Sequence, residues 1–236
     1  MLDERREIFA EELEAIVSLA DSLRSIPAHE KVVGQPCWDN VWLPRLDAAA
    51  LYTRLVRKNP KLYLEVGSGY STGFARRAIR DYNLRTKIVS IDPHPRADID
   101  ALCDQIIRRP VEETDLAIFQ RLESGDILFI DSSHCSYQNS DVTVLMMEVL
   151  PELTEGVHVH FHDIYWPYDY PANSLAQFCN EQYVVGAHLV AGSGSDITLA
   201  NQYIAQDADL VKGVTSIWGR TAKVDGTSMW LISRGD

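Results

Sequence analysis

The chain has 236 residues, of which 46% are hydrophobic and 24% charged, and its formal net charge is −12. This length favours one α/β domain with appendages over two full domains. The acidic balance, with no compensating block of Lys and Arg, argues against nucleic acid as a partner and favours a small-molecule substrate. The charged N-terminal stretch and the lack of an apolar run of roughly 18–20 residues predict a cytoplasmic protein with no membrane partner.

An amphipathic helix is predicted over Leu2–Leu23, because apolar residues recur there at steps of three and four. The stripe consists of Phe9, Leu13, Ile16, Ala20 and Leu23. It suits packing on the main domain, but Phe9, Ile16 and Leu23 are a heptad apart, which also suits a homodimer seam. The sequence leaves both interpretations open.

A loop over residues 26–44 carries Trp38 and Trp42, and a second helix is expected over Leu46–Lys58, before Pro60. The two tryptophans either line a substrate pocket or cover the edge of the sheet. Four scattered cysteines show no metal-site spacing and are expected to be free thiols.

From Lys61 onwards, short apolar runs alternate with helical stretches, which is the pattern of βαβ units. We therefore expect a Rossmann-like, doubly wound, mostly parallel sheet with helices on both faces over residues 61–236, preceded by N-terminal helices and a loop over residues 1–60. The predicted strands are Leu62–Val66, Ile88–Asp92, Gln105–Arg108, Asp126–Asp131, Val157–His162 and Ser228–Ser233. The predicted helices are Ser71–Tyr82, Ala97–Cys103, Thr114–Leu122, Ser140–Leu150 and Asn173–Tyr183, and residues 184–224 are expected to form loops with one or two further strands.

A glycine turn follows the first predicted strand, within the run Leu62-Tyr-Leu-Glu65-Val-Gly67-Ser68-Gly69-Tyr-Ser71. Gly67 and Gly69 lack a Cβ, so the chain can turn tightly and a ligand can approach, while the next helix presents free N–H groups. Asp92 ends the following strand, where its carboxylate can accept hydrogen bonds from ribose hydroxyls. Such a turn binds a nucleotide or an amino-acid carboxylate, and Asp92 adds a site for the ribose of an adenosine.

Details of the turn discriminate between two cofactor classes. A dinucleotide fingerprint has glycine at its sixth position, which here is Thr72. Glu65 places a carboxylate where an ammonium group is favoured and a pyrophosphate is not. An NAD-type Rossmann oxidoreductase is therefore the weaker alternative, and a non-catalytic cofactor-binding protein with the same fold is a third.

These motifs resemble those of class I S-adenosylmethionine-dependent methyltransferases. Glu65-Val-Gly67-Ser68-Gly69 is similar to their first motif, and Asp92 to their ribose-binding acid. The run from Asp126 through Asp131 to His134, followed by Tyr137 and Asp141, resembles a motif of methyltransferase family 24, a branch that acts on small molecules. His162-Asp163 matches a His-Asp pair that commonly closes the fifth strand of that branch. The resemblance covers roughly residues 61–163.

The resemblance implies O-methylation of a small molecule, such as a sugar moiety or a hydroxylated metabolite. The turn from Glu65 to Gly69, with Ser68 and Ser71, would receive the methionine end of S-adenosylmethionine. Asp92 would bind the ribose, Val111–Glu113 would lie near the adenine, and Asp131 would lie beside the methyl group.

Asp131, His134, His162 and Asp163 are expected to meet at the carboxyl edge of the sheet. Transfer of a methyl group to a hydroxyl needs alignment and a base or a metal that removes the acceptor's proton. Asp131, His134 and His162 are therefore the candidate catalytic residues, since histidine suits the base role. Alternatively, Mg²⁺ or another divalent cation held by Asp131, His162 and Asp163 would lower the pKa of the hydroxyl.

Two further groups of residues carry open or structural interpretations. His158 and His160 share a face with His162 and are expected to be packed core histidines. After His162-Asp163 comes a run rich in aromatic residues and proline, which forms either an apolar wall for the acceptor or a lid without substrate contact. Its aromatic members are Tyr165, Trp166, Tyr168 and Tyr170.

Overall fold

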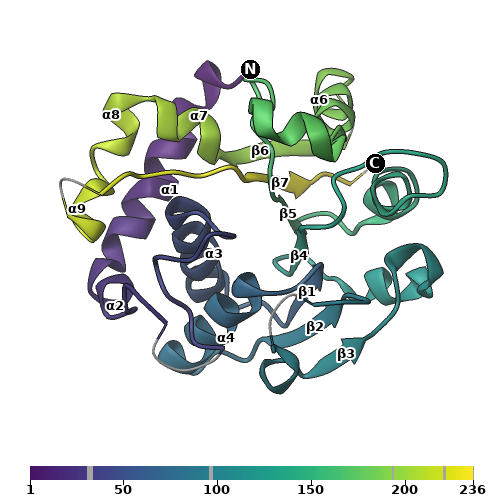
Figure 1. Cartoon of the computed structure of the whole chain (residues 1–236), viewed down its shortest axis with the longest axis horizontal. Helices are drawn as coiled ribbons and strands as arrows, with labels where there is room; N and C mark the ends of the chain where they lie inside the picture. The colour runs from purple at the N-terminus through teal and green to yellow at the C-terminus, as the bar shows by residue number, and fades with distance from the viewer. Residues whose placement is uncertain (31–33, 96–97, 193, 220–221, 236) are drawn as a thin grey trace.

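The computed structural model describes residues 1–30, 34–95, 98–192, 194–219 and 222–235. Its centre is a seven-stranded sheet with the order β3-β2-β1-β4-β5-β7-β6 (Figure 1). The first five strands run parallel, and β7 is antiparallel to both of its neighbours. The strands are β1 (Leu62–Val66), β2 (Lys87–Ile91), β3 (Gln105–Ile107), β4 (Ile127–Ile130), β5 (His158–Phe161), β6 (Ser195–Ala200) and β7 (Met229–Ser233). The predicted Rossmann-like, mostly parallel sheet is confirmed, and the strands expected from the sequence differ from the observed ones by one residue at some ends.

The strand order reverses between β1 and β4. From β1 the chain runs outward through β2 to β3, and β4 then returns to the opposite side of β1. In open α/β sheets such a switch point lies at the carboxyl ends of the strands and is where ligands bind. Val66 pairs with Ile130 across the switch, so the residues that follow these two strand ends are neighbours. The topology therefore brings the glycine turn after β1 beside Asp131 after β4.

Helices surround this sheet (Figure 1). In the described ranges, none of them is both long enough and apolar enough to cross a membrane. Helix α5 continues as a π-helical turn over Leu145–Val149 and a 3-10 turn over Leu150–Glu152. The helices are α1 (Arg6–Ser18), α2 (Ala20–Arg24), α3 (Arg45–Lys58), α4 (Tyr70–Tyr82), α5 (Asp141–Val144), α6 (Glu181–Val190), α7 (Asn201–Gln206), α8 (Ala208–Val211) and α9 (Thr215–Trp218).

The predicted N-terminal helix is present as α1 and α2, and its apolar stripe is buried in the core of this chain. Phe9, Ile16 and Leu23 are at most 1% exposed. Phe9 packs edge-on against Tyr203 of α7, with 5.9 Å between the ring centroids. The residues that also suited a dimer seam thus contact this chain's own elements.

The two tryptophans of the loop before α3 have different environments. Trp38 is buried, its ring lies 5.4 Å from Phe74 and 5.2 Å from Trp218, and its Nε1–H donates to the carbonyl of Leu23. Trp42 is 51% exposed. Trp38 is therefore a core residue, whereas Trp42 lies at the surface near the switch point, as the pockets described below show.

Several expectations outside the strands were wrong. The helix predicted over Asn173–Tyr183 is a 3-10 helix over Ala172–Gln177, and α6 begins only at Glu181, because Phe178 adopts a left-handed backbone with φ of 57°. The stretch Thr114–Leu122 contains a 3-10 helix over Leu116–Arg121 instead of an α-helix. The helix predicted over Ala97–Cys103 begins outside the described residues, and its described part is a 3-10 turn over Asp100–Leu102.

The C-terminal region contains more helix than expected. Residues 184–224 hold the end of α6, strand β6 and the three short helices α7, α8 and α9, where loops with one or two strands were predicted. The three helices have four to six residues each. That length is under two helical turns, so no apolar period can be read from the sequence.

Candidate active site

Gly67 is the residue on which the turn after β1 depends. Its φ is +79°, and a Cβ built there would lie 1.7 Å from the backbone carbonyl oxygen of Asp131. Only glycine fits both the left-handed conformation and the close approach. The Asp131 N–H donates to the carbonyl of Val66, and the Gly67 N–H donates to the carbonyl of Ile91. The turn is therefore fixed against the ends of both β2 and β4.

Asp92 organises the other side of the turn. One of its carboxylate oxygens accepts hydrogen bonds from the backbone N–H and the hydroxyl of Ser68, at 2.8 and 2.9 Å. The other oxygen accepts the backbone N–H of His94 at 2.8 Å. A carboxylate offers about four acceptor positions, so capacity for a further donor remains. Asp92 is thus placed to hold Ser68 and to receive a ligand hydroxyl.

Two neighbouring pockets lie over this turn. The larger has a volume of about 320 Å³, and its wall includes some of the residues predicted to lie at the cofactor, Gly67, Ser68, Asp92, Val111, Glu112 and Asp131, together with Tyr137 and Asp141. Gly69 and Ser71, which were also predicted to bind the cofactor, line the smaller pocket instead. The smaller has about 120 Å³ and is lined by Trp42, Leu43, Ser68, Gly69, Tyr70, Ser71 and Asp131. Ser68 and Asp131 line both pockets, so these two residues mark the junction between them.

Glu65 lies beneath the turn and is not part of the described lining of either pocket. Its side chain is fully buried and accepts hydrogen bonds from the hydroxyls of Tyr63, Ser71 and Thr72. Burial raises the pKa of Glu65 to about 8, although the three hydroxyl donors favour its ionised form. Because Ser71 and Thr72 are in the first turn of α4, Glu65 fixes the start of that helix.

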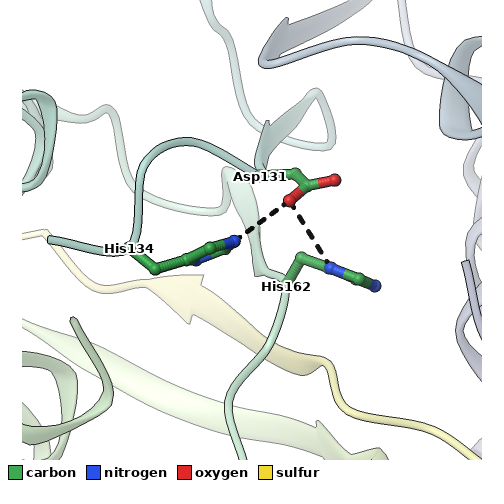
Figure 2. Close-up of side chains that lie close together, drawn as sticks. All are labelled: Asp131, His134 and His162. Atoms are coloured by element: carbon green, nitrogen blue, oxygen red, sulfur yellow. Dashed lines mark ion pairs between the residues drawn. The ribbon is translucent and has the colours of Figure 1, made fainter. Parts of the chain in front are cut away.

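Asp131, His134 and His162 converge beside the junction, as the sequence predicted (Figure 2), although only Asp131 is in the described lining of the two pockets. Nε2 of His134 lies 3.3 Å from Oδ1 of Asp131, and Nδ1 of His162 lies 3.5 Å from the same oxygen. Asp163 completes the group, since its carboxylate lies 3.7 Å from Nε2 of His134 and 3.6 Å from Nδ1 of His162. Ligand atoms of Asp131, His134 and His162 lie within 4.8 Å of one another, a grouping that can hold a metal ion.

The charges of the cluster are strongly coupled. Burial alone would lower the pKa of His162, but the carboxylates of Asp131, Asp163 and Asp47 raise it to about 9. Burial also opposes protonation of His134, yet its contacts with Asp131 and Glu181 hold its pKa well above the usual value. Burial would raise the pKa of Asp131, and the two histidines instead hold it well below its ordinary range. Both imidazoles are therefore protonated at neutral pH unless a cation takes the place of their protons.

Two buried carboxylates behind the histidines were missed by the sequence reasoning. Nδ1 of His134 lies 2.8 Å from Oε2 of Glu181, at the start of α6. Nε2 of His162 lies 3.6 Å from Oδ2 of Asp47, in the first turn of α3. Both carboxylates are fully buried. Neither residue stands in a motif or after a strand, so the sequence carries no local signal for this role.

The other histidines of β5 are core residues, as predicted. Nδ1 of His158 lies 3.1 Å from the guanidinium of Arg54, which makes the ring nitrogen the acceptor. His160 stacks on Phe129 with ring centroids 4.0 Å apart and meets Trp230 edge-on at 4.7 Å. Neither residue lies in the wall of the two pockets.

The aromatic run after Asp163 packs against α6. The Tyr165 N–H donates to the side chain of Gln182, whose own backbone N–H donates to the Tyr170 hydroxyl. The rings of Tyr165 and Tyr170 lie 5.6 Å apart. Trp166 lies against Gly186, and Tyr168 is 46% exposed. These contacts hold the run beside Asp163 but place none of its rings in the described walls of the two pockets.

Comparison with known proteins agrees with these observations. The family described as a methyltransferase domain matches residues 64–164. This segment is similar to that family and makes up less than half of the chain. It contains the glycine turn, Asp92, Asp131, His134 and the His162-Asp163 pair, while Asp47 and Glu181 lie outside it. The match thus covers the motifs read from the sequence but not the two buried carboxylates.

One curated relative is an uncharacterised protein of Archaeoglobus fulgidus, 30% identical over 89 residues that make up 35% of this chain and 40% of that protein. The chain therefore matches less than half the length of this relative. Among solved structures, an O-methyltransferase of Bacillus cereus in complex with SAH is 15% identical, covers 94% of this chain and 91% of its own, and has a TM-score of 0.46. A Podospora anserina methyltransferase bound to SAH is 15% identical, and the match covers 94% of this chain and 88% of that protein with a TM-score of 0.49. At these low identities and scores, the activity of this chain has to be inferred from its own residues.

Proposed function

We propose that the chain is an S-adenosylmethionine-dependent O-methyltransferase that acts on a hydroxyl group of a small molecule. The observation that carries this proposal is the junction between the two pockets. Asp131 and Ser68 line both the larger pocket, which contains Asp92, and the smaller pocket, which contains Trp42. A cofactor in the first pocket and an acceptor in the second would meet beside Asp131.

The larger pocket fits the cofactor in its chemistry. Gly67 provides the tight turn that packs against the Asp131 backbone in the wall of this pocket, and Asp92 retains acceptor capacity for ribose hydroxyls. Val111 and Glu112 form the part of the wall that we assign to the adenine. Glu65 lies beneath the turn, and its hydrogen bonds to Ser71 and Thr72 support a role in holding the turn that would receive the methionine end.

S-adenosylmethionine, when bound, supplies a methyl group on a sulfonium, and the acceptor oxygen forms a bond to that carbon as the carbon–sulfur bond breaks. The acceptor hydroxyl must then lose its proton, which Asp131, His134 and His162 are placed to receive or stabilise. The proposal includes a divalent cation, Mg²⁺ or another, held by Asp131, His162 and Asp163. Such an ion would lower the pKa of the hydroxyl. It is favoured over a histidine base, because the neighbouring carboxylates raise the pKa of both imidazoles and so make each a poorer acceptor of a proton at neutral pH.

The first test is calorimetric titration with S-adenosylhomocysteine, with NAD as the comparison ligand. We expect saturable binding of S-adenosylhomocysteine and none of NAD. The variant Asp92→Asn should bind about 10- to 100-fold more weakly, because a hydrogen bond to a charged group contributes about 1.5–3 kcal/mol. Binding of NAD alone would overturn the proposal in favour of an oxidoreductase.

Asp104→Asn is the matched control. Like Asp92, Asp104 is a carboxylate that accepts a backbone N–H. Its donor is Ile88 of β2 at 3.0 Å, and it forms ion pairs with Arg76 and Lys87. It lies at the opposite end of the strand, outside the larger pocket. The control should therefore lose stability without losing affinity for S-adenosylhomocysteine. Equal loss of affinity in both variants would show that Asp92 acts only through the fold.

Turnover needs a separate test. The protein should be incubated with S-adenosylmethionine that carries a labelled methyl group and with panels of sugars and hydroxylated aromatic compounds, with and without divalent cations. Labelled product identifies the acceptor class. Binding of the cofactor without product from any hydroxylated acceptor would instead favour a non-catalytic protein that retains the fold.

A further inference from the structure

The cluster at the pocket junction contains two imidazoles that point at the same carboxylate oxygen (Figure 2). Nε2 of His134 and Nδ1 of His162 lie 3.3 and 3.5 Å from Oδ1 of Asp131, and the Asp163 carboxylate lies 3.7 and 3.6 Å from the same two nitrogens. Four ligands at about 2.0–2.1 Å from a tetrahedral ion lie about 3.3 Å apart. The four N–O separations exceed that value by at most about 0.4 Å, and ligand atoms of Asp131, His134 and His162 lie within 4.8 Å of one another. Asp163 faces His134 with Oδ2 and His162 with Oδ1, so its carboxylate has to turn to present one oxygen to the same ion.

His162 supplies independent evidence that a ligand belongs here. It is 3% exposed, and neither of its ring nitrogens has a hydrogen-bond partner among the described residues. A buried polar group without a partner costs about 1–3 kcal/mol. The side chain is nevertheless aimed at Asp131 and Asp163 at the pocket junction. An ion bound between these residues would satisfy Nδ1.

The outer nitrogen of each imidazole faces a buried carboxylate. Glu181 lies 2.8 Å from Nδ1 of His134. A metal-bound imidazole is neutral, and in that form Glu181 makes Nδ1 the donor, so that Nε2 presents its lone pair to the ion. Asp47 lies 3.6 Å from Nε2 of His162, which is beyond hydrogen-bond distance, so it acts on this ring through its charge. Metal-binding histidines commonly have such an outer carboxylate, which sets the tautomer and the ring orientation.

Asp47 is itself held firmly by its neighbours. It accepts hydrogen bonds from the backbone N–H groups of Thr227 and Ser228, from the Ser228 hydroxyl and from the Asn201 amide. The carboxylate therefore stays in place whether or not His162 is protonated. Its position behind the ring is a fixed feature of the fold.

We infer that Asp131, His134, His162 and Asp163 form a two-histidine, two-carboxylate site for a first-row transition metal ion such as Zn²⁺ or Co²⁺, with Glu181 and Asp47 as positioning residues. Imidazole is a ligand of choice for such ions, whereas Mg²⁺ prefers oxygen ligands in octahedral geometry. The inference adds His134 to the ligands proposed above and narrows the class of ion. Its catalytic meaning rests on the proposed methyltransferase function, but ion binding itself does not.

The test is titration of chelator-treated, metal-free protein with Co²⁺, followed by visible absorption spectroscopy. We expect one Co²⁺ per chain with the intense absorption of a four-coordinate ion, complete displacement by one equivalent of Zn²⁺, and no displacement by a large excess of Mg²⁺. Absence of this absorption, or displacement by Mg²⁺ as effective as that by Zn²⁺, would overturn the inference.

Variants assign the residues. Asp163→Asn removes a ligand whose side chain is 39% exposed, so the fold should tolerate it, and Co²⁺ affinity should fall at least 10-fold. Glu181→Gln should lower the affinity about 10- to 100-fold, as the loss of an outer carboxylate does elsewhere. His158→Gln is the matched control, because it removes a buried histidine of the same strand that contacts Arg54 and not the cluster. If the control lost as much affinity as the other two variants, the cluster would not be the site.

Calorimetry with S-adenosylhomocysteine on the same metal-free protein separates the two proposals. Binding of S-adenosylhomocysteine without four-coordinate Co²⁺ would reject the metal site and retain the methyltransferase. Binding of Co²⁺ as described without S-adenosylhomocysteine would support the metal site and reject the proposed cofactor.

Discussion

Replacement of Gly67 by alanine should damage both the fold and the proposed cofactor pocket. Gly67 has φ of +79°, and its added Cβ would lie 1.7 Å from the carbonyl oxygen and 2.7 Å from the carbonyl carbon of Asp131. Both atoms belong to the backbone, so no rotation of a side chain relieves the collision. The ends of β1 and β4 would have to separate.

The size of the effect follows from two contributions. Alanine in a left-handed conformation costs about 1–2 kcal/mol. Forcing extra volume into a packed site costs typically about 1–3 kcal/mol more. We therefore expect Gly67→Ala to lower the free energy of unfolding by about 2–5 kcal/mol, a large part of the roughly 5–15 kcal/mol typical of a folded protein.

The assay is urea unfolding followed by circular dichroism, with Gly125→Ala as the matched control. Gly125 also has positive φ, +88°, but a Cβ there meets no atom within 4 Å. The control shares the conformational cost and lacks the collision, so the difference between the two variants isolates the contact with Asp131. Equal destabilisation of Gly67→Ala and Gly125→Ala would refute the reasoning.

Three further perturbations test the fold around the site. Burial beside Arg54 lowers the pKa of His158 to about 3, so below pH 6.5 the unfolded chain takes up a proton that the folded protein does not. The wild type therefore loses stability as the pH falls. Between pH 7 and pH 5, the free energy of unfolding of His158→Gln should fall by about 2 kcal/mol less than that of the wild type. Asp126→Asn should cost about 2–3 kcal/mol in urea unfolding, because Asp126 accepts backbone N–H groups of Lys61, Leu62 and Glu123 and an amide nitrogen would oppose one of them. Trp38→Ala should lower the unfolding free energy by about 3–5 kcal/mol, and a loss below 1 kcal/mol would contradict its place in the core.

The strands were predictable because each is a short apolar run with clear limits. Leu62–Val66 and Ile127–Ile130 are fully buried, as expected for parallel strands with both faces covered. The helical segments were harder to predict because much of the helical chain lies in 3-10 turns or in helices shorter than two turns. Such segments are stabilised by tertiary packing and not by a repeating apolar period.

The inner residues of the site were also predictable, because strand ends obey a simple rule. Asp92, Asp131 and Asp163 each follow a parallel strand, and the carboxyl ends of parallel strands share one edge. Glu65 was predicted to bind the cofactor, but its place beneath the turn was not foreseen, because the hydroxyls of α4 that bond to it are brought there only by the fold. Asp47 and Glu181 start helices far from any motif, and no sequence rule connects them with His162 or His134.

The segments outside residues 64–164 are therefore part of the site and not appendages to it. His134 and Asp163 both adopt left-handed backbone conformations, with φ of 59° and 52°, which are sparsely populated for residues other than glycine. The carbonyl of His134 accepts the N–H groups of Asn180 and Glu181, and Asp163 accepts the hydroxyl of Thr227. Thr227 also donates to Asp47. Three segments outside the matched residues thus hold the two strained residues and both histidine rings in place. They are helix α3, the start of α6 and the stretch before β7. In the proposed enzyme, the residues of the family motifs would supply the reactive groups, and these flanking segments would determine how those groups are oriented.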